Sequence, residues 1–130
     1  LPQQSKEEEN VFYITVNGHT LTADFADNSS ALAFRELLSE GALTVSMDDY
    51  GGFEKVGSLG TTLPRNDSWI TTEPGDVILY QGSRITIYYD KNSWSFTRLG
   101  KVRDMTQAQL REALGAGEGE VEIVFSLEAA

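Results

Sequence analysis

The sequence predicts a mainly β fold: a closed eight-stranded barrel capped by two α-helices. About eight short segments carry the alternating or continuous apolar pattern of strands, and two longer segments carry the spacing of amphipathic helices. Few edge-protecting residues flank the first and last predicted strands, and closure into a barrel removes such open edges. With 130 residues, the chain is long enough for one domain with a single core.

The first two strands form a predicted hairpin over residues 11–25. Asn17-Gly18 is a favoured two-residue turn of type I′. This turn fixes the register and places the apolar side chains of both strands on one face. The predicted facing pairs are Val16–His19, Ile14–Leu21 and Phe12–Ala23.

Both predicted helices have recognisable ends. The first, over residues 30–40, follows possible N-caps at 27–30 and ends before Gly41. The second begins at a Thr106–Gln109 capping box and ends at Gly115.

Further strands are predicted between and after the helices, and Pro74-Gly75 has the composition of a type II turn. Residues 49–67 are rich in glycine and lack periodicity, so we expect a long loop of the kind that often carries function. The remaining strands are expected at 43–48, 68–72, 77–81, 84–89, 93–99 and 121–127.

Composition excludes several classes of function. A net charge of −10 with ten scattered Lys and Arg argues against a nucleic-acid partner. The absence of cysteine excludes disulfides and thiolate chemistry, and the single histidine, His19, is expected to be exposed. We interpret Asp48-Asp49 as a solvated strand end, and we expect no metal, no cofactor, no membrane span and a monomer.

The polar residues 1–10 are expected to be a disordered linker, followed by the barrel domain at 11–130. Because the sequence starts with Leu1, we expect an exported or lipid-anchored protein whose signal has been removed. The alternative is a cytoplasmic protein with a cloning boundary at this point.

Motifs throughout the folded part resemble those of a family of small, uncharacterised bacterial cyclophilin-like proteins. The resemblance implies the cyclophilin barrel, and some family members are associated with flavodoxin-like domains. The matching segments are 13–18, 27–30, 47–51, 54–57, 59–60, 63–67, 72–76, 79–82, 92–94 and 97–100.

True cyclophilins are peptidyl-prolyl isomerases that place an Arg, in a Phe-x-Arg motif, beside an apolar pocket for proline. The comparable segment here is Phe53-Glu54-Lys55, and Lys lacks the planar fork of Arg. No catalytic residue is therefore carried over, and enzymatic activity stays an open question.

Most aromatic residues fall between 50 and 96, which favours an aromatic binding surface. The first hypothesis is a non-enzymatic module that binds a peptide or protein segment. The alternatives are a divergent prolyl isomerase, and a small-molecule binder or accessory of a flavodoxin-like redox protein. The candidate ligand-binding residues are Arg65, Phe53, Tyr80, Gln81 and Trp94. For Arg65 an ion pair with a nearby carboxylate is the alternative role.

Overall fold

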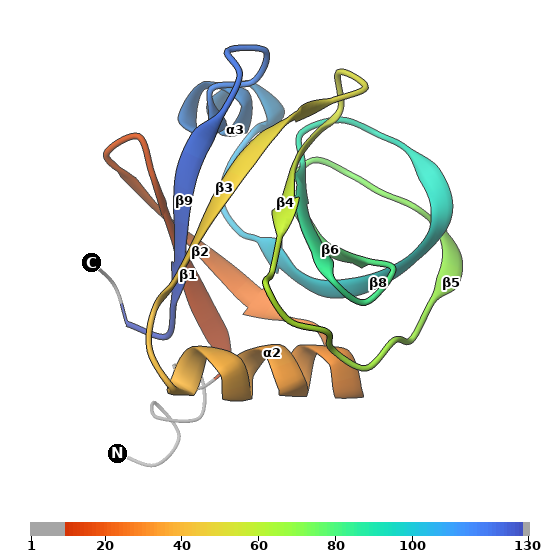
Figure 1. Ribbon diagram of the computed structural model, residues 1–130. Helices are drawn as coiled ribbons and strands as arrows, with labels where there is room; N and C mark the ends of the chain where they lie inside the picture. Colours follow the sequence, from red (N-terminus) through yellow and green to blue (C-terminus); the bar gives the residue numbers. More distant parts are fainter. Residues whose placement is uncertain (1–9, 129–130) are drawn as a thin grey trace.

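The computed structural model describes residues 10–128, so the predicted linker at 1–10 lies outside the described residues except for Asn10. The described residues form two helices and nine strands. Figure 1 shows α2 below and α3 above the strands. The elements are β1 (Val11–Val16), β2 (His19–Phe25), α2 (Ser29–Ser39), β3 (Leu43–Tyr50), β4 (Glu54–Ser58), β5 (Ser68–Thr71), β6 (Asp76–Tyr80), β7 (Arg84–Tyr88), β8 (Ser93–Val102), α3 (Gln107–Leu114) and β9 (Val121–Ser126).

Eight of the strands close into an antiparallel barrel, in the order β1-β2-β8-β6-β7-β4-β3-β9 and back to β1. The ninth strand, β5, lies outside this barrel, and in the described part of the chain it pairs only with the first half of β8. The prediction of a closed eight-stranded barrel with two helices is therefore confirmed, although the set of strands differs. The segment at 68–71 is not a barrel strand, and β4, inside the predicted loop 49–67, is one.

Local signals in the sequence set the ends of several elements. The first hairpin has the predicted register, with Asn17 and Gly18 both at positive φ, as a type I′ turn requires. The side chain of Asn28 caps α2, and Thr106 and Gln109 form the predicted capping box of α3.

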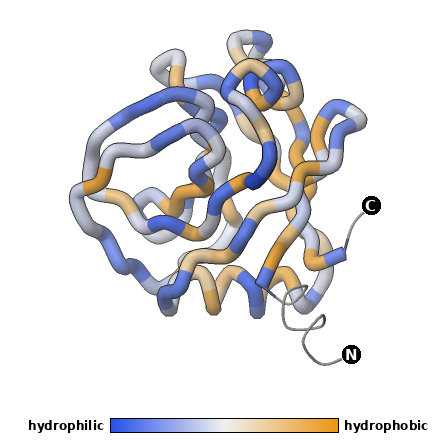
Figure 2. Tube along the Cα trace, turned by 180° about the vertical axis from the view of Figure 1, so that it is seen from behind, coloured by the Kyte–Doolittle hydropathy of each residue, from blue (hydrophilic) through white to orange (hydrophobic). Residues whose placement is uncertain are grey.

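One continuous apolar core fills the barrel. Side chains of β1, β2, β3 and β9 contribute to it, α2 adds Phe34 and Leu38, and α3 adds Leu110 and Leu114. Figure 2 shows hydrophobic and hydrophilic residues interchanging along the strands, as expected where the two faces of a strand meet different surroundings.

Strands β6 and β7 are buried on both faces. Val77, Leu79, Ile85 and Ile87 point into the barrel core. The alternate residues belong to a second, smaller cluster on the outer face, and its buried members are Ile78, Tyr88 and Phe96. This outer face is where a concave surface forms.

No helix within residues 10–128 is both long and apolar enough to cross a membrane.

Candidate functional site

The outer cluster borders an open groove of about 400 Å³, within the size range of small-ligand sites. It lies on the outer face of β4, β6, β7 and the first half of β8. Figure 1 shows β4, β6 and β8 in the right-hand part of the molecule. Six of the ten residues that line it are aromatic. The lining residues are Tyr50, Phe53, Glu54, Val56, Tyr80, Arg84, Tyr88, Asn92, Trp94 and Phe96.

Strand alternation places these side chains on the outer face. Glu54 and Val56 share one face of β4, and they are paired across the ladder with Tyr88 and Thr86 of β7. The intervening Lys55 points the other way, toward the barrel interior.

The aromatic rings of the groove support one another. Phe53 stacks on Tyr88 with a centroid distance of 5.8 Å and an interplanar angle of 2°, and Tyr50 meets the edge of Phe53 at 6.1 Å. Tyr88 also packs on Phe96, which contacts Tyr80. Such ring pairs hold the wall in one arrangement before any ligand arrives.

Glu54 is the buried polar group of this wall, with only 6% of its surface exposed. Burial raises the pKa of the Glu54 carboxyl above its ordinary value, while a hydrogen bond from the Tyr88 hydroxyl acts in the opposite direction. Burial, together with the adjacent Glu54 carboxylate, also raises the pKa of Tyr88, so this phenol stays protonated. The amide of Asn92 donates to the Tyr88 oxygen over 3.3 Å.

The sequence-predicted site residues divide into two groups. Phe53, Tyr80 and Trp94 all line the groove. Gln81 is exposed in the β6–β7 turn at φ +52°, and Arg65 is paired with Asp67, with its Nε 2.8 Å from the carboxylate. The groove therefore brings together three of the five predicted residues.

The predicted loop 49–67 is anchored to the barrel at several points, although many of its residues are exposed. Leu59 and Leu63 are buried, and their backbone N–H groups donate to carbonyl groups of the β6–β7 turn. Asn66 donates to the hydroxyl of Ser30 in α2 over 2.8 Å. Only the start of this segment and β4 reach the groove.

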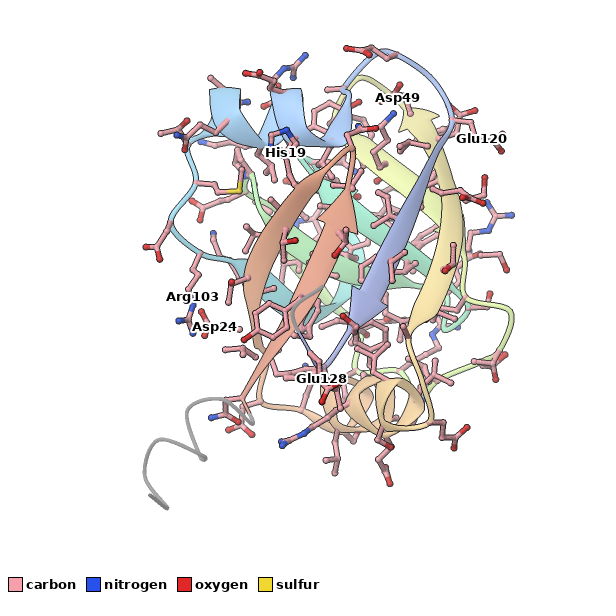
Figure 3. The ribbon with its side chains drawn as sticks, turned by 90° about the vertical axis from the view of Figure 1, so that its left-hand side faces the viewer. His19, Asp24, Asp49, Arg103, Glu120 and Glu128 are labelled. Carbon is pink, nitrogen blue, oxygen red and sulfur yellow. The ribbon has the colours of Figure 1, made fainter. Side chains whose placement is uncertain are left out.

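A second polar cluster lies at the end of the barrel beneath the loop that precedes β9, where Figure 3 shows Asp49. Lys55, which is fully buried, donates to the carbonyl of Gly119 and lies 3.1 Å from Asp49. The Asp49 carboxylate also accepts from the Tyr89 hydroxyl at 2.7 Å and from the backbone N–H of Gly119 at 2.9 Å.

The prediction that Asp48-Asp49 is a solvated strand end is wrong for Asp49. Burial alone would raise its pKa, but hydrogen bonds from the backbone of Gly117 and Gly119, Tyr89 and Lys55 outweigh it and lower the pKa to about 2. Asp48 is exposed, as predicted. His19 is exposed at the start of β2, also as predicted, and Figure 3 shows it beside α3.

Within residues 10–128 no group of three or more His, Cys, Asp or Glu side chains is arranged to hold a metal ion.

Sequence reasoning missed Glu54, Tyr88, Arg84 and Asn92 as members of one site. The available signal was the position of Glu54, a charged residue directly after Phe53 and close to Tyr50. Glu54 can be assigned to the groove only once residues 54–58 are known to form β4, and these residues were expected to belong to a loop.

Comparison with known proteins agrees with this architecture. The model of the cyclophilin-like family matches residues 14–126. No match was found among curated proteins.

Two solved structures share the fold. "Structure of McbB in complex with tryptophan" is similar with a TM-score of 0.66 and 20% identity, over 88% of this chain and 44% of that one. The chain thus spans less than half of the McbB chain. The solution structure of the hypothetical protein AF2241 from Archaeoglobus fulgidus is similar with a TM-score of 0.64 and 11% identity, over 91% of this chain and 94% of that one. At these identities the likeness establishes the fold alone.

Proposed function

The chain belongs to the cyclophilin-like family, and we propose that it is a non-enzymatic binding module that takes a small aromatic molecule into its outer groove. The observation that carries the proposal is the groove itself: an open concavity with six aromatic side chains around one buried carboxyl group. Apolar walls with a few fixed polar groups are typical of small-molecule sites. The tryptophan bound to McbB, a protein of similar fold, supports an aromatic ligand.

The barrel suits this role because it holds the wall rigidly. The strands that line the groove also contribute the aliphatic residues of the main core, so the outer side chains stand on a fixed scaffold. We propose that the two helices close the ends of the barrel, which leaves its outer face for recognition.

Two neighbouring tryptophans offer a matched test of the site. Trp94 and Trp69 are both exposed and their rings lie 6.0 Å apart, but only Trp94 lines the groove. We expect Trp94→Ala to weaken binding of a neutral aromatic probe such as indole about tenfold, measured by ¹⁵N NMR titration. Trp69→Ala should leave the affinity within about twofold, since a lost stacking contact costs about 0.5–1.5 kcal/mol only where the ring touches the ligand. Equal losses in both variants, or no shifts near the groove, would reject the proposal.

A peptide ligand is the second candidate, favoured by the open edge of β5. Among residues 10–128 this strand pairs only with β8, so its other edge can accept an extended segment beside the exposed Trp69. Shifts concentrated at residues 68–71 during titration with a peptide would support this mode over the groove.

The remaining alternative is a divergent prolyl isomerase. Its candidate catalytic arginine is Arg84, because this is the arginine that lines the groove. Exchange between the cis and trans signals of an Xaa-Pro peptide would reveal turnover. Loss of that exchange in Arg84→Ala, but not in Arg65→Ala, would locate the activity in the groove.

A further inference from the structure

The buried carboxyl group of the groove has no cation to balance it among residues 10–128. Glu54 is 6% exposed, and the salt bridges formed among residues 10–128 do not include it. Buried charges in proteins are normally paired, because a carboxylate removed from water without a partner is costly.

Neither nearby cationic residue fills this role. Lys55 follows Glu54 directly but points to the opposite face of β4, where it is held by Asp49. Arg84 lies at the far end of the groove: the β4–β7 ladder pairs Glu54 with Tyr88 and Ser58 with Arg84. Four residues of strand separate the two positions, a distance of about 13 Å.

The hydrogen bonds around Glu54 define what it offers to a ligand. Asn92 donates its amide hydrogen to the Tyr88 oxygen, and Tyr88 then has its single hydroxyl hydrogen for Glu54. Glu54 therefore accepts from Tyr88, which suits the ionised carboxylate and leaves further acceptor positions open to the groove. Tyr50, which is paired with Glu54 across the β3–β4 ladder, brings a second phenol near it, and Glu54 is the anionic residue among those that line the groove.

The walls favour the same class of ligand. A cation placed over an aromatic face is attracted by the ring, and the attraction grows where water is excluded. A cation held by the Glu54 carboxylate would therefore also lie against the half-buried ring of Phe53, which lines the same groove.

We propose that the groove selects ligands that carry a protonated amine on an aromatic body, with Glu54 as the counter-ion of that amine. The inference rests on the proposed binding function of the groove and names the chemical class of its ligand. In such a complex Glu54 makes the polar contact with the amine, and the aromatic side chains of the groove make the apolar contact with the ligand body.

The test uses three probes with the same phenylethyl body and different head groups: 2-phenylethylamine, 2-phenylethanol and 3-phenylpropionate. Dissociation constants are measured by ¹⁵N NMR at pH 7 for the natural protein, Glu54→Gln and Glu122→Gln. Glu122 is an exposed residue of β9, so its variant makes the same change in net charge away from the groove.

We expect the amine to bind the natural protein at least tenfold more tightly than the alcohol, and the propionate to bind most weakly. The preference for the amine should fall to about twofold or less in Glu54→Gln and persist in Glu122→Gln. The spectra of the free variants report whether each one is folded.

Equal affinity for amine and alcohol, or a preference that survives in Glu54→Gln, would overturn the inference while leaving the groove a binding site. If none of the three probes shifts the signals of groove residues, the proposed binding function fails as well. The two failures are therefore distinguishable in one data set.

Discussion

Glu54 and Lys55 are adjacent in β4 and both buried, yet they face two very different regions. Lys55 points toward the barrel end, where Asp49 and the Gly119 carbonyl satisfy its charge. Glu54 points into the open groove, where a phenol is its partner and a cation is missing. A charge balanced within the chain serves the fold, whereas a charge left for an outside partner serves recognition.

Removal of the Lys55 charge should give the largest effect. Lys55→Met leaves Asp49 without its cation, and breaking one side of a buried pair costs about 3–5 kcal/mol. Because Asp49 is partly exposed, we expect about 3 kcal/mol of lost unfolding free energy in urea denaturation.

The exposed Lys91→Met is the control, with an expected change below about 0.5 kcal/mol. Similar losses in the two variants would mean that the Lys55 cluster does not stabilise the fold.

Acid should weaken the same cluster by a smaller amount. The pKa of Asp49 is about 2 in the folded protein, below its ordinary value of 3.8 in an unfolded chain. The contribution of Asp49 to the free energy of unfolding is therefore present above about pH 4 and is lost as pH falls through 2. With allowance for solvent screening, we expect Asp49 to account for about 1–2 kcal/mol of the decrease in unfolding free energy.

This decrease is measured by denaturation between pH 5 and 2 in Asp49→Asn and in its exposed neighbour, Asp48→Asn. The free energy of unfolding should depend less steeply on pH in Asp49→Asn than in the natural protein, whereas Asp48→Asn should keep the natural slope. A slope unchanged by that substitution would contradict the role of Asp49.

Glu54→Gln should have the smallest effect on stability, within about 1 kcal/mol. The amide oxygen can still accept from Tyr88, and the substitution removes a desolvated charge that no ion pair of the described residues balances. Thermal unfolding of this variant and of Glu122→Gln measures the difference. A loss as large as that of Lys55→Met would make Glu54 a structural residue and erase the contrast between the two regions.

Much of the barrel follows from local patterns in the sequence. The Asn17-Gly18 turn sets the first hairpin, and the capping box at Thr106 sets the start of α3. The Pro74-Gly75 turn is also present, with Gly75 at φ +99° and a hydrogen bond from Asp76 N–H to the Glu73 carbonyl. In each of these places the neighbouring residues alone determine the backbone.

The candidate site was only partly predictable, because its geometry depends on long-range pairing. β4 begins with two charged residues followed by Val-Gly-Ser, a composition typical of a loop. It becomes a strand because β3 and β7 pair with its two edges, while Lys55 forms an ion pair on one face and Glu54 a hydrogen bond with Tyr88 on the other. A strand whose stability comes from its neighbours leaves little local signal.

The position of β9 in the barrel has a consequence for how the protein is made. β9 is hydrogen-bonded between β1 and β3, pairing Tyr13 with Ser126 across almost the whole sequence. The barrel therefore stays open between β1 and β3 until residues 121–126 have left the ribosome. Contacts between residues so distant in the sequence form slowly. During that interval β1 and β3 lack the strand that joins them, and their unpaired edges and apolar faces are exposed to aggregation in a way that the finished barrel prevents.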